Sequence, residues 1–293
     1  MAVPELAGGR TYTYSLCECC NTMAIQSSQT NNAPRPDAPG RDGSDSEHAR
    51  LIELMEAAAS VVALTGAGIS VPSGIPDFRT PRTGLWEKVN PMEVAHIDAF
   101  RSDPVRFWSF YGERFATLGD KQPNGAHHAL VALETAGVLD AVITQNIDML
   151  HRRAGTRELV EVHGSIATCS CPRCEVGVDV EEVRARLSDA ADGVPRCEHC
   201  AGPLKPDVVL FGEMLSPHAL GRAQELCEGA DVLLCIGSSL EVHPVAGLPL
   251  LTRRSGGAVA IITQGPTPLD DIADVRLSGD VVGELQALAG ALS

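Results

Sequence analysis

Four cysteines near the middle of the chain form two closely spaced pairs. Cys171 and Cys174 make one C-x2-C pair, and Cys197 and Cys200 make a second after 22 further residues. Each C-x2-C turn can direct two thiolates at one metal ion, so two turns complete a tetrahedral zinc site. Because protein ligands fill all four positions, we expect one structural zinc ion. Four buried free thiols are the alternative, and Cys169 could exchange with Cys171 as a ligand.

Side chains suited to proton transfer and amide recognition occur in two further segments. "ITQNIDML" contains Gln145, Asn146 and Asp148, and "VEVHGS" places His163 before a glycine. An imidazole with an unperturbed pKa of about 6.5 can accept a proton near neutral pH. Taken singly, Asn146 and Asp148 are also typical turn formers, and a lone histidine is usually structural. Their occurrence together in one chain favours a functional site.

A glycine-rich stretch supplies a candidate phosphate-binding loop. In "ALTGAGISVPSGIPDFR", residues 63–79, an apolar run ends in Gly66, Ala67 and Gly68. Glycines allow close approach of a phosphate to backbone N–H groups. The dinucleotide fingerprint of dehydrogenases needs a third glycine at position 71, which is Val71 here, and an acidic residue about 20 residues later, which is not evident. The loop therefore favours a bound nucleotide but not an ordinary dehydrogenase.

These loops follow apolar runs that we interpret as strands. The runs are "SVVALTG", "AVITQN", "DVVLFGE", "DVLLCIGSS" and "AVAIITQG". Helical patterns lie between them in "EHARLIELMEAA", "HHALVALETAG", "SPHALGRAQELCEG" and "DVVGELQALAGAL". Alternating strands and helices predict an α/β fold, with a parallel sheet covered by helices on both faces. Ligands bind such sheets at the carboxyl ends of the strands, where the polar loops fall.

Three segments depart from this alternation. Residues 80–124 are aromatic and helix-prone, and residues 165–204 contain the cysteine pairs. We expect both to be insertions that form a smaller second lobe. Residues 1–47 are rich in polar residues, proline and glycine, so we expect a disordered head, with residues 48–293 as the catalytic domain. Three head cysteines, Cys17, Cys19 and Cys20, lack a clearly spaced fourth ligand.

Composition excludes several classes of partner. The 293 residues include 44% hydrophobic residues, enough for a large core, and carry a net charge of −15. A nucleic-acid-binding protein would normally present a basic surface. The apolar runs have strand length and are too short to span a bilayer, and no secretory leader is evident. We therefore expect a cytoplasmic protein without nucleic-acid or membrane partners.

The motifs together resemble those of the sirtuin family of NAD-dependent protein deacylases. "GAGIS…SGIPDFR", "TQNID", "HG", the two C-x2-C pairs, "KPDVVLFGE" and "GSSLEVHP" occur in the family's order, over about residues 47–290. The resemblance implies a Rossmann-like lobe and a smaller zinc lobe, with NAD and an acyl-lysine of a substrate protein in the cleft between them. Where the family often has asparagine, this chain has Thr263, which leaves the adenosine contacts open.

The resemblance also implies which residues bind the cofactor and perform the chemistry. NAD would contact Gly66, Ala67, Gly68, Asp77, Phe78, Arg79, Gln145, Asn146, Ile147, Asp148, Gly237, Ser238, Ser239, Thr263 and Val281. The acyl oxygen would attack C1′ of the ribose as nicotinamide leaves. Asp148 would bind the carboxamide, with Asn146 beside it, Gln145 would hold the ribose, and His163 would be the general base. The products would be deacylated lysine, nicotinamide and O-acyl-ADP-ribose.

The acylated peptide would add as a strand between "VVLFGE" and "LEVHP". The implied substrate-binding residues there are Val209, Phe211, Gly212, Glu213 and Val242. Tyr111 and Arg114 resemble a Tyr-x-x-Arg pair with which one sirtuin branch holds acidic acyl chains, because a guanidinium can bind a carboxylate with two N–H donors. The alternative is that Tyr111 packs in a core and Arg114 forms a surface pair. We expect deacetylation, with desuccinylation as a second activity.

Two other functions stay open at this level. A mono-ADP-ribosyltransferase would use the same NAD site with another nucleophile. A zinc-ribbon interaction protein with a vestigial nucleotide fold would have lost its cleft residues, yet Asn146, Asp148 and His163 are all present.

Overall fold

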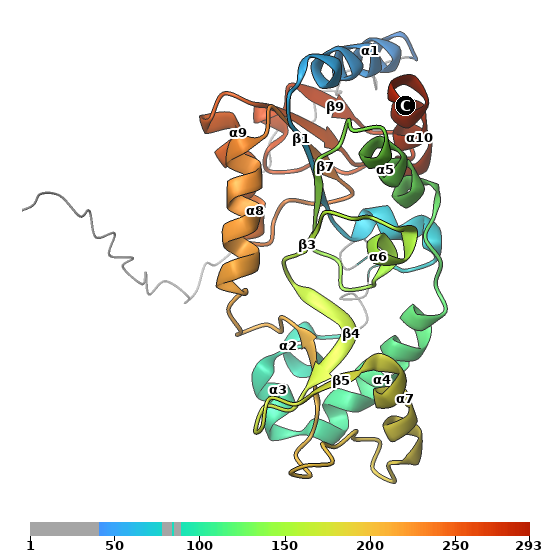
Figure 1. The fold of residues 1–293 in the computed structure, drawn as a ribbon, viewed down its shortest axis with the longest axis vertical. Helices are drawn as coiled ribbons and strands as arrows, with labels where there is room; N and C mark the ends of the chain where they lie inside the picture. The colour runs from blue at the N-terminus through green and yellow to red at the C-terminus, as the bar shows by residue number, and fades with distance from the viewer. Residues whose placement is uncertain (1–40, 78–83, 85–88) are drawn as a thin grey trace, which may run out of the picture. The chain divides into compact units, whose positions relative to one another are not determined.

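The computed structural model describes residues 41–77, 84 and 89–293. Among these residues, a six-stranded parallel sheet has the order β3-β2-β1-β7-β8-β9 (Figure 1). Its strands are β1 (Val61–Thr65), β2 (Ala141–Thr144), β3 (Leu159–Glu161), β7 (Val232–Ile236), β8 (Ala258–Ile262) and β9 (Val275–Leu277). The chain builds the sheet outward from β1 through β2 to β3 and then returns to place β7 on the other side of β1. The point where the strand order reverses therefore lies between β1 and β7.

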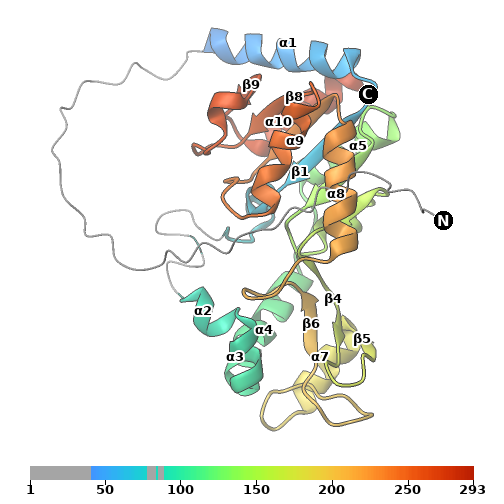
Figure 2. The same cartoon turned by 90° about the vertical axis from the view of Figure 1, so that its left-hand side faces the viewer.

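Helices cover both faces of this sheet, which confirms the predicted fold class. Core residues of α1 (Arg41–Ala57), α5 (Gly125–Thr135) and α10 (Val281–Leu292) pack on one face, and those of α8 (Pro217–Gly229) and α9 (Leu248–Arg254) pack on the other (Figure 2). Successive residues of β1 alternate between the two cores, with Val61 and Ala63 in the first and Val62 and Leu64 in the second. Both faces are buried because parallel strands need helical crossovers.

A second lobe is built largely from the two predicted insertions. Helices α2 (Pro91–Val94), α3 (Ile97–Ser102) and α4 (Pro104–Gly119) come from the first, and β4 (Gly164–Ser170), β5 (Gly177–Asp179) and α7 (Val180–Asp189) come almost wholly from the second. A further strand, β6 (Lys205–Val208), follows the second insertion in the chain. One hydrophobic cluster contains Phe107 and Phe115 of α4 together with Ile166 of β4. The indole Nε1 of Trp108 donates to the carbonyl oxygen of Leu204, 2.9 Å away. The two insertions thus share a single core.

Short elements complete the chain at the sheet edge and in the loops. They are η1 (Ala67–Ser73), α6 (Leu150–Ala154), η3 (Val245–Gly247) and η4 (Asp270–Ile272). Asn124 caps α5 by accepting from the N–H of Ala126, and Asp103 caps α4 by accepting from the N–H of Arg106. No helix among the described residues is long and apolar enough to cross a membrane.

One strand prediction is wrong in its assignment. The apolar run "DVVLFGE" was expected in the parallel sheet, but its strand, β6, ends at Val208 and belongs to the three-stranded sheet β5-β4-β6 of the second lobe. It pairs antiparallel with β4, and its residues alternate between half-buried and buried positions, as expected for a strand with one solvated face. The expected boundary at residue 47 lies inside α1, and residues 1–40 of the expected head, including its three cysteines, lie outside the described residues.

Candidate active site

Two glycine loops meet at the reversal point of the parallel sheet. The N–H of Gly68, just after β1, donates to the carbonyl oxygen of Gly237, just after β7, over 2.8 Å. A Cβ on Gly68 would lie 2.7 Å from the Cα of Gly237, which itself has φ +58°. Only glycine permits this backbone-to-backbone contact. Because neither glycine has a side chain, the contact keeps side chains away from the strand ends where α/β sheets bind nucleotides.

A buried polar network joins the first glycine loop to the loop after β2. The hydroxyl of Ser70 donates to Oδ2 of Asp148 over 2.6 Å and accepts from Nδ2 of Asn146 over 3.2 Å. The Asn146 amide also donates to the carbonyl oxygen of Gly66 at 3.1 Å. Burial raises the pKa of Asp148, while hydrogen bonds from Ser70 and from the N–H of Leu150 act in the opposite direction. Ser70 is a site residue to which the sequence analysis gave no role, although it stands in the quoted "GAGIS" motif.

The geometry around His163 defines which ring nitrogen can act as a base. Its Nδ1 lies 3.0 Å from the carbonyl oxygen of Gln145. A carbonyl oxygen can only accept, so Nδ1 carries the proton and Nε2 retains its lone pair. Burial lowers the pKa of His163 from its ordinary value of 6.5, and the bond to Gln145 opposes that shift in part. His163 is therefore held neutral with one nitrogen available to accept a proton.

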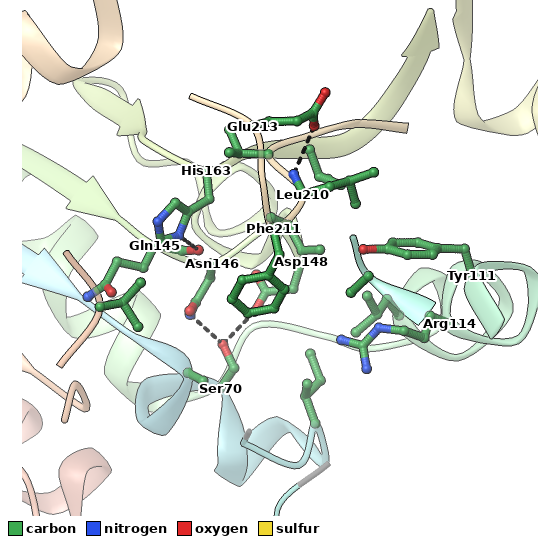
Figure 3. A pocket seen from close by; sticks show the side chains of 18 of the residues that line it. Ser70, Tyr111, Arg114, Gln145, Asn146, Asp148, His163, Leu210, Phe211 and Glu213 are labelled. Carbon is green, nitrogen blue, oxygen red and sulfur yellow. Dashed lines mark hydrogen bonds between the residues drawn. The ribbon is translucent and has the colours of Figure 1, made fainter. Parts of the chain in front are cut away.

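These groups lie around one cavity of about 360 Å³ (Figure 3). Its lining includes these predicted residues: Ala67, Tyr111, Arg114, Gln145, Asn146, Ile147, Asp148, His163, Val209, Phe211, Gly212, Glu213 and Val242. Other predicted contacts lie outside the lining given by the described residues: Gly66, Gly68, Asp77, Gly237, Ser238, Ser239, Thr263 and Val281. Phe78 and Arg79 are outside the described part of the chain.

Several residues outside the lining are nevertheless tied to the site or to the sheet. Ser238 accepts a 2.9 Å hydrogen bond from Nε2 of Gln145, so it adjoins the cavity. Thr263 follows β8 and donates its N–H to the carbonyl oxygen of Leu277 at 3.0 Å. Val281 is the first residue of α10 and packs against the sheet core.

Two residues of α4 give one part of the cavity a polar end. The Tyr111 ring is buried and stacks on Phe107, with ring centroids 4.5 Å apart. Burial raises the pKa of Tyr111 to about 12, although nearby Arg114 opposes this. The guanidinium carbon of Arg114 lies 5.7 Å from the centroid of the Phe110 ring. Burial lowers the pKa of Arg114, while Tyr111 and Asp148 raise it. A neutral phenol and a guanidinium thus lie one helical turn apart.

The segment after β6 forms one rim of the cavity. Its Val209 donates an N–H to the carbonyl oxygen of His163 at 2.8 Å, and Phe211 pairs with Ala95 and Ile97 through its N–H and carbonyl oxygen. Gly212 has φ +82°, and a Cβ there would lie 2.6 Å from Nε2 of a histidine side chain. Among the described residues, the carbonyl oxygen of Val209 and the backbone of Gly212 make no hydrogen bond. These groups are available to an added strand.

The four predicted zinc ligands come together in the second lobe. All four Sγ atoms, of Cys171, Cys174, Cys197 and Cys200, lie within 4.8 Å of one another. Three of the Sγ–Sγ distances are 3.4, 3.5 and 3.8 Å. A tetrahedral zinc ion with Zn–S bonds of about 2.3 Å requires sulfurs about 3.8 Å apart, so the group fits the ion. Cys169 is buried outside this group, and none of the four ligands lines the cavity.

Two buried histidines adjoin the strand ends. His127 of α5 and His151 of α6 have ring centroids 4.9 Å apart, and Nε2 of His151 lies 2.9 Å from Oγ1 of Thr65. Burial lowers the pKa of His127 to about 4 and that of His151 to about 3. Both rings are therefore neutral at physiological pH. The sequence analysis did not single them out.

The fold and the cavity define an α/β protein that binds a nucleotide at the end of a Rossmann-like sheet, with a zinc-binding second lobe. The model of the Sir2 family matches residues 66–244, and this chain belongs to that family. The resemblance to sirtuins is thereby confirmed.

Similar proteins agree with this assignment. An NAD-dependent protein deacetylase of Sulfolobus acidocaldarius is 44% identical over 229 residues, which cover 78% of this chain and 88% of that protein. NAD-dependent protein deacylase 1 of Archaeoglobus fulgidus is 42% identical over 239 residues, with 80% and 95% covered. A Sir2–p53 peptide–NAD+ structure has a TM-score of 0.77 at 42% identity, covering 83% of this chain and 98% of its own. A Sir2 structure bound to a propionylated peptide has a TM-score of 0.76 at 40% identity, with 84% and 99% covered.

Proposed function

We propose that this protein is an NAD-dependent protein-lysine deacylase that acts on acylated lysines of other proteins. The observation that carries the proposal is the single cavity shared by His163, the Asn146–Asp148 pair and the free backbone groups of the rim. A base, an amide-recognition pair and a strand-docking edge are the three parts that such a reaction needs. The proposal includes the expected catalytic domain, residues 48–293, and a cytoplasmic location.

The glycine loops and the buried network fit a dinucleotide. Gly68 and Gly237 are half-buried and place no side chain at the strand ends, and the carboxylate of Asp148, which already accepts from Ser70 and Leu150, retains lone pairs for a carboxamide N–H2. NAD supplies a ribose carbon that becomes electrophilic when its bond to nicotinamide breaks. Asn146 and Asp148 would hold the nicotinamide, Gln145 the ribose, and the glycine loops the diphosphate.

His163 accepts the proton in this scheme. Its Nδ1 is committed to the carbonyl oxygen of Gln145, so Nε2 is the nitrogen that would take a proton from a ribose hydroxyl. The depressed pKa keeps the base unprotonated at neutral pH. Val209, whose N–H donates to the backbone of His163, has its own carbonyl oxygen available, and this oxygen would accept a hydrogen bond from the substrate lysine.

The polar end of the cavity supports a second class of acyl group. Arg114 would bind the terminal carboxylate of a succinyl chain, and the protonated phenol of Tyr111 would donate a further hydrogen bond. Apolar residues of the same cavity, such as Leu118 and Leu210, would contact the methylene groups. We expect Arg114→Met to lower kcat/KM for a succinyl-lysine peptide by about 10-fold or more and to change that for acetyl-lysine little. Absence of succinyl turnover in the wild type would refute this part of the proposal.

The decisive experiment is release of nicotinamide that depends on an acylated peptide. The wild type should convert acetyl-lysine peptide and NAD to deacylated peptide, nicotinamide and O-acetyl-ADP-ribose, identified by mass spectrometry. His163→Ala should retain its fold and zinc and lose about 10²–10⁴-fold in rate. ADP-ribose found on a protein acceptor instead would favour a mono-ADP-ribosyltransferase. Unchanged NAD and peptide with folded, zinc-loaded protein would refute the proposal.

A further inference from the structure

Lys205, at the start of β6, directs its ammonium group back onto the rim of the cavity. The Nζ atom lies 3.1 Å from the carbonyl oxygen of Pro206, 2.9 Å from that of Val208 and 3.0 Å from Oε2 of Glu213. An ammonium group has three N–H donors, so all three are used within one short segment. The Lys205 side chain is only 16% exposed, which strengthens these contacts relative to a surface ion pair.

Glu213 makes two hydrogen bonds to Leu210 within the rim segment. The same Oε2 that binds Lys205 accepts from the N–H of Leu210 at 2.9 Å (Figure 3). The N–H of Glu213 in turn donates to the carbonyl oxygen of Leu210 at 3.0 Å. Both backbone groups of Leu210 are thus occupied by Glu213. The loop between them is held as a tight turn, which requires the positive φ of Gly212.

This turn determines which backbone groups of the rim face an incoming strand. With Leu210 bound by Glu213 and Phe211 bound by residues 95 and 97, the carbonyl oxygen of Val209 and the backbone of Gly212 are the groups left over. Val209 is also bonded to the backbone of His163. A shift of the turn would therefore move the docking groups relative to the proposed base.

We infer that Lys205 and Glu213 are positioning residues for the acyl-lysine peptide, acting through the turn and not through contact with the peptide. The inference rests on the proposed function, and it changes the expected role of Glu213 from a direct contact to an internal brace. Loss of either side chain would leave Leu210 or the carbonyl oxygens of β6 without their partners and would loosen the docking edge.

The test separates peptide binding from turnover. In steady-state assays with acetyl-lysine peptide, Lys205→Met and Glu213→Ala should each raise the peptide KM about 10-fold, with kcat and the NAD KM within about threefold of the wild type. The double variant should be no worse than the worse single variant, because the two side chains act as one unit. Glu213→Gln, whose amide oxygen can still accept from Leu210, should lie between the wild type and Glu213→Ala.

Controls make each outcome decisive. Asp192→Asn removes an ion pair with Arg196 in the same lobe and should leave peptide KM unchanged. Thermal unfolding and zinc content identify any variant that fails to fold, in which case Glu213→Gln serves as the test. Unchanged peptide KM in both single variants, or a loss of kcat at constant KM, would overturn the inference.

A binding experiment tests the same roles without turnover. Fluorescence anisotropy with a labelled acetyl-lysine peptide measures the effect of Lys205 and Glu213 on peptide affinity even if the wild type proves inactive. A wild type that binds no such peptide also overturns the inference.

Discussion

Replacing Gly68 by alanine is the most direct perturbation of the crossing between the two glycine loops. The added Cβ would lie 2.7 Å from both the Cα and the carbonyl oxygen of Gly237, short of an ordinary contact of about 3.5 Å. Both atoms are backbone and cannot rotate away, so the two loops must separate. The φ of Gly68 is not in the left-handed region, so the effect isolates steric overlap from backbone strain.

The expected size of the effect follows from this overlap. Overpacking of this kind costs about 2 kcal/mol, which lowers the midpoint of thermal unfolding by about 4–8 °C in a protein of this size. A displacement approaching 1 Å at the strand ends should also lower kcat/KM for NAD about 100-fold. Differential scanning fluorimetry and nicotinamide-release kinetics at varied NAD concentration measure the two effects.

Gly221 provides the matched control. It lies in α8, and a Cβ there would meet nothing within 4 Å. Alanine at this position should stabilise the protein by about 0.5–1 kcal/mol, because glycine is the poorer helix residue, and should leave NAD kinetics unchanged. If Gly68→Ala had the same midpoint of thermal unfolding as Gly221→Ala and the same NAD kinetics, the close approach of the two loops would not be needed for the site.

Three further predictions concern protons and metal. Because burial lowers the pKa of His163 below 6.5 and the neutral ring is the proposed base, kcat/KM should be flat above pH 7 and fall only below about pH 6.5; a rate that rises on acidification would contradict the proposed role of His163. The buried His127 and His151 have native pKa values of about 4 and about 3, below the unfolded value of 6.5, so the stability they support is present above pH 6.5 and lost as the pH falls. Each of the two histidines should lower the free energy of unfolding by about 1.4 kcal/mol per pH unit below 6.5. Denaturant titrations at pH 7.5 and 5.5 should therefore show a smaller loss of stability in His127→Gln than in the wild type. The cysteine cluster should hold one zinc per chain, so removal of zinc with a chelator should lower the unfolding midpoint and abolish activity; a metal-free protein of unchanged stability would refute a structural role.

The sequence was sufficient to predict features that depend on residues close together in the chain. The two C-x2-C pairs specified four ligands because each pair lies within one turn, and the structure brings all four together. The strands after which Gly66 and Asn146 stand were also recognisable, because parallel strands buried on both faces appear as continuous apolar runs. Two interpretations weighed for Asp148 are compatible, since it accepts from Leu150 at a turn and also lines the cavity.

Features that depend on distant partners could not be predicted. An apolar run does not specify which sheet it joins, so β6 was expected in the wrong one. Ser70 meets Asp148 across 78 positions of sequence, and no local pattern marks that pair. The inward direction of the Glu213 carboxylate follows from the turn at Gly212, and the proton position on His163 follows from the carbonyl of Gln145. Each is a product of tertiary structure.

The central pairing of the sheet has a consequence for biosynthesis. Val61 of β1 lies beside Val232 of β7, although more than half of the chain separates them. A ribosome must therefore translate through β7 before β1 acquires its second neighbour, and until then one edge of a strand that is fully buried in the folded protein stays unpaired. Such long-range closure is slow and exposes nascent chains to aggregation, so shortened translation products that end before Val232 are expected to need chaperones or to be degraded.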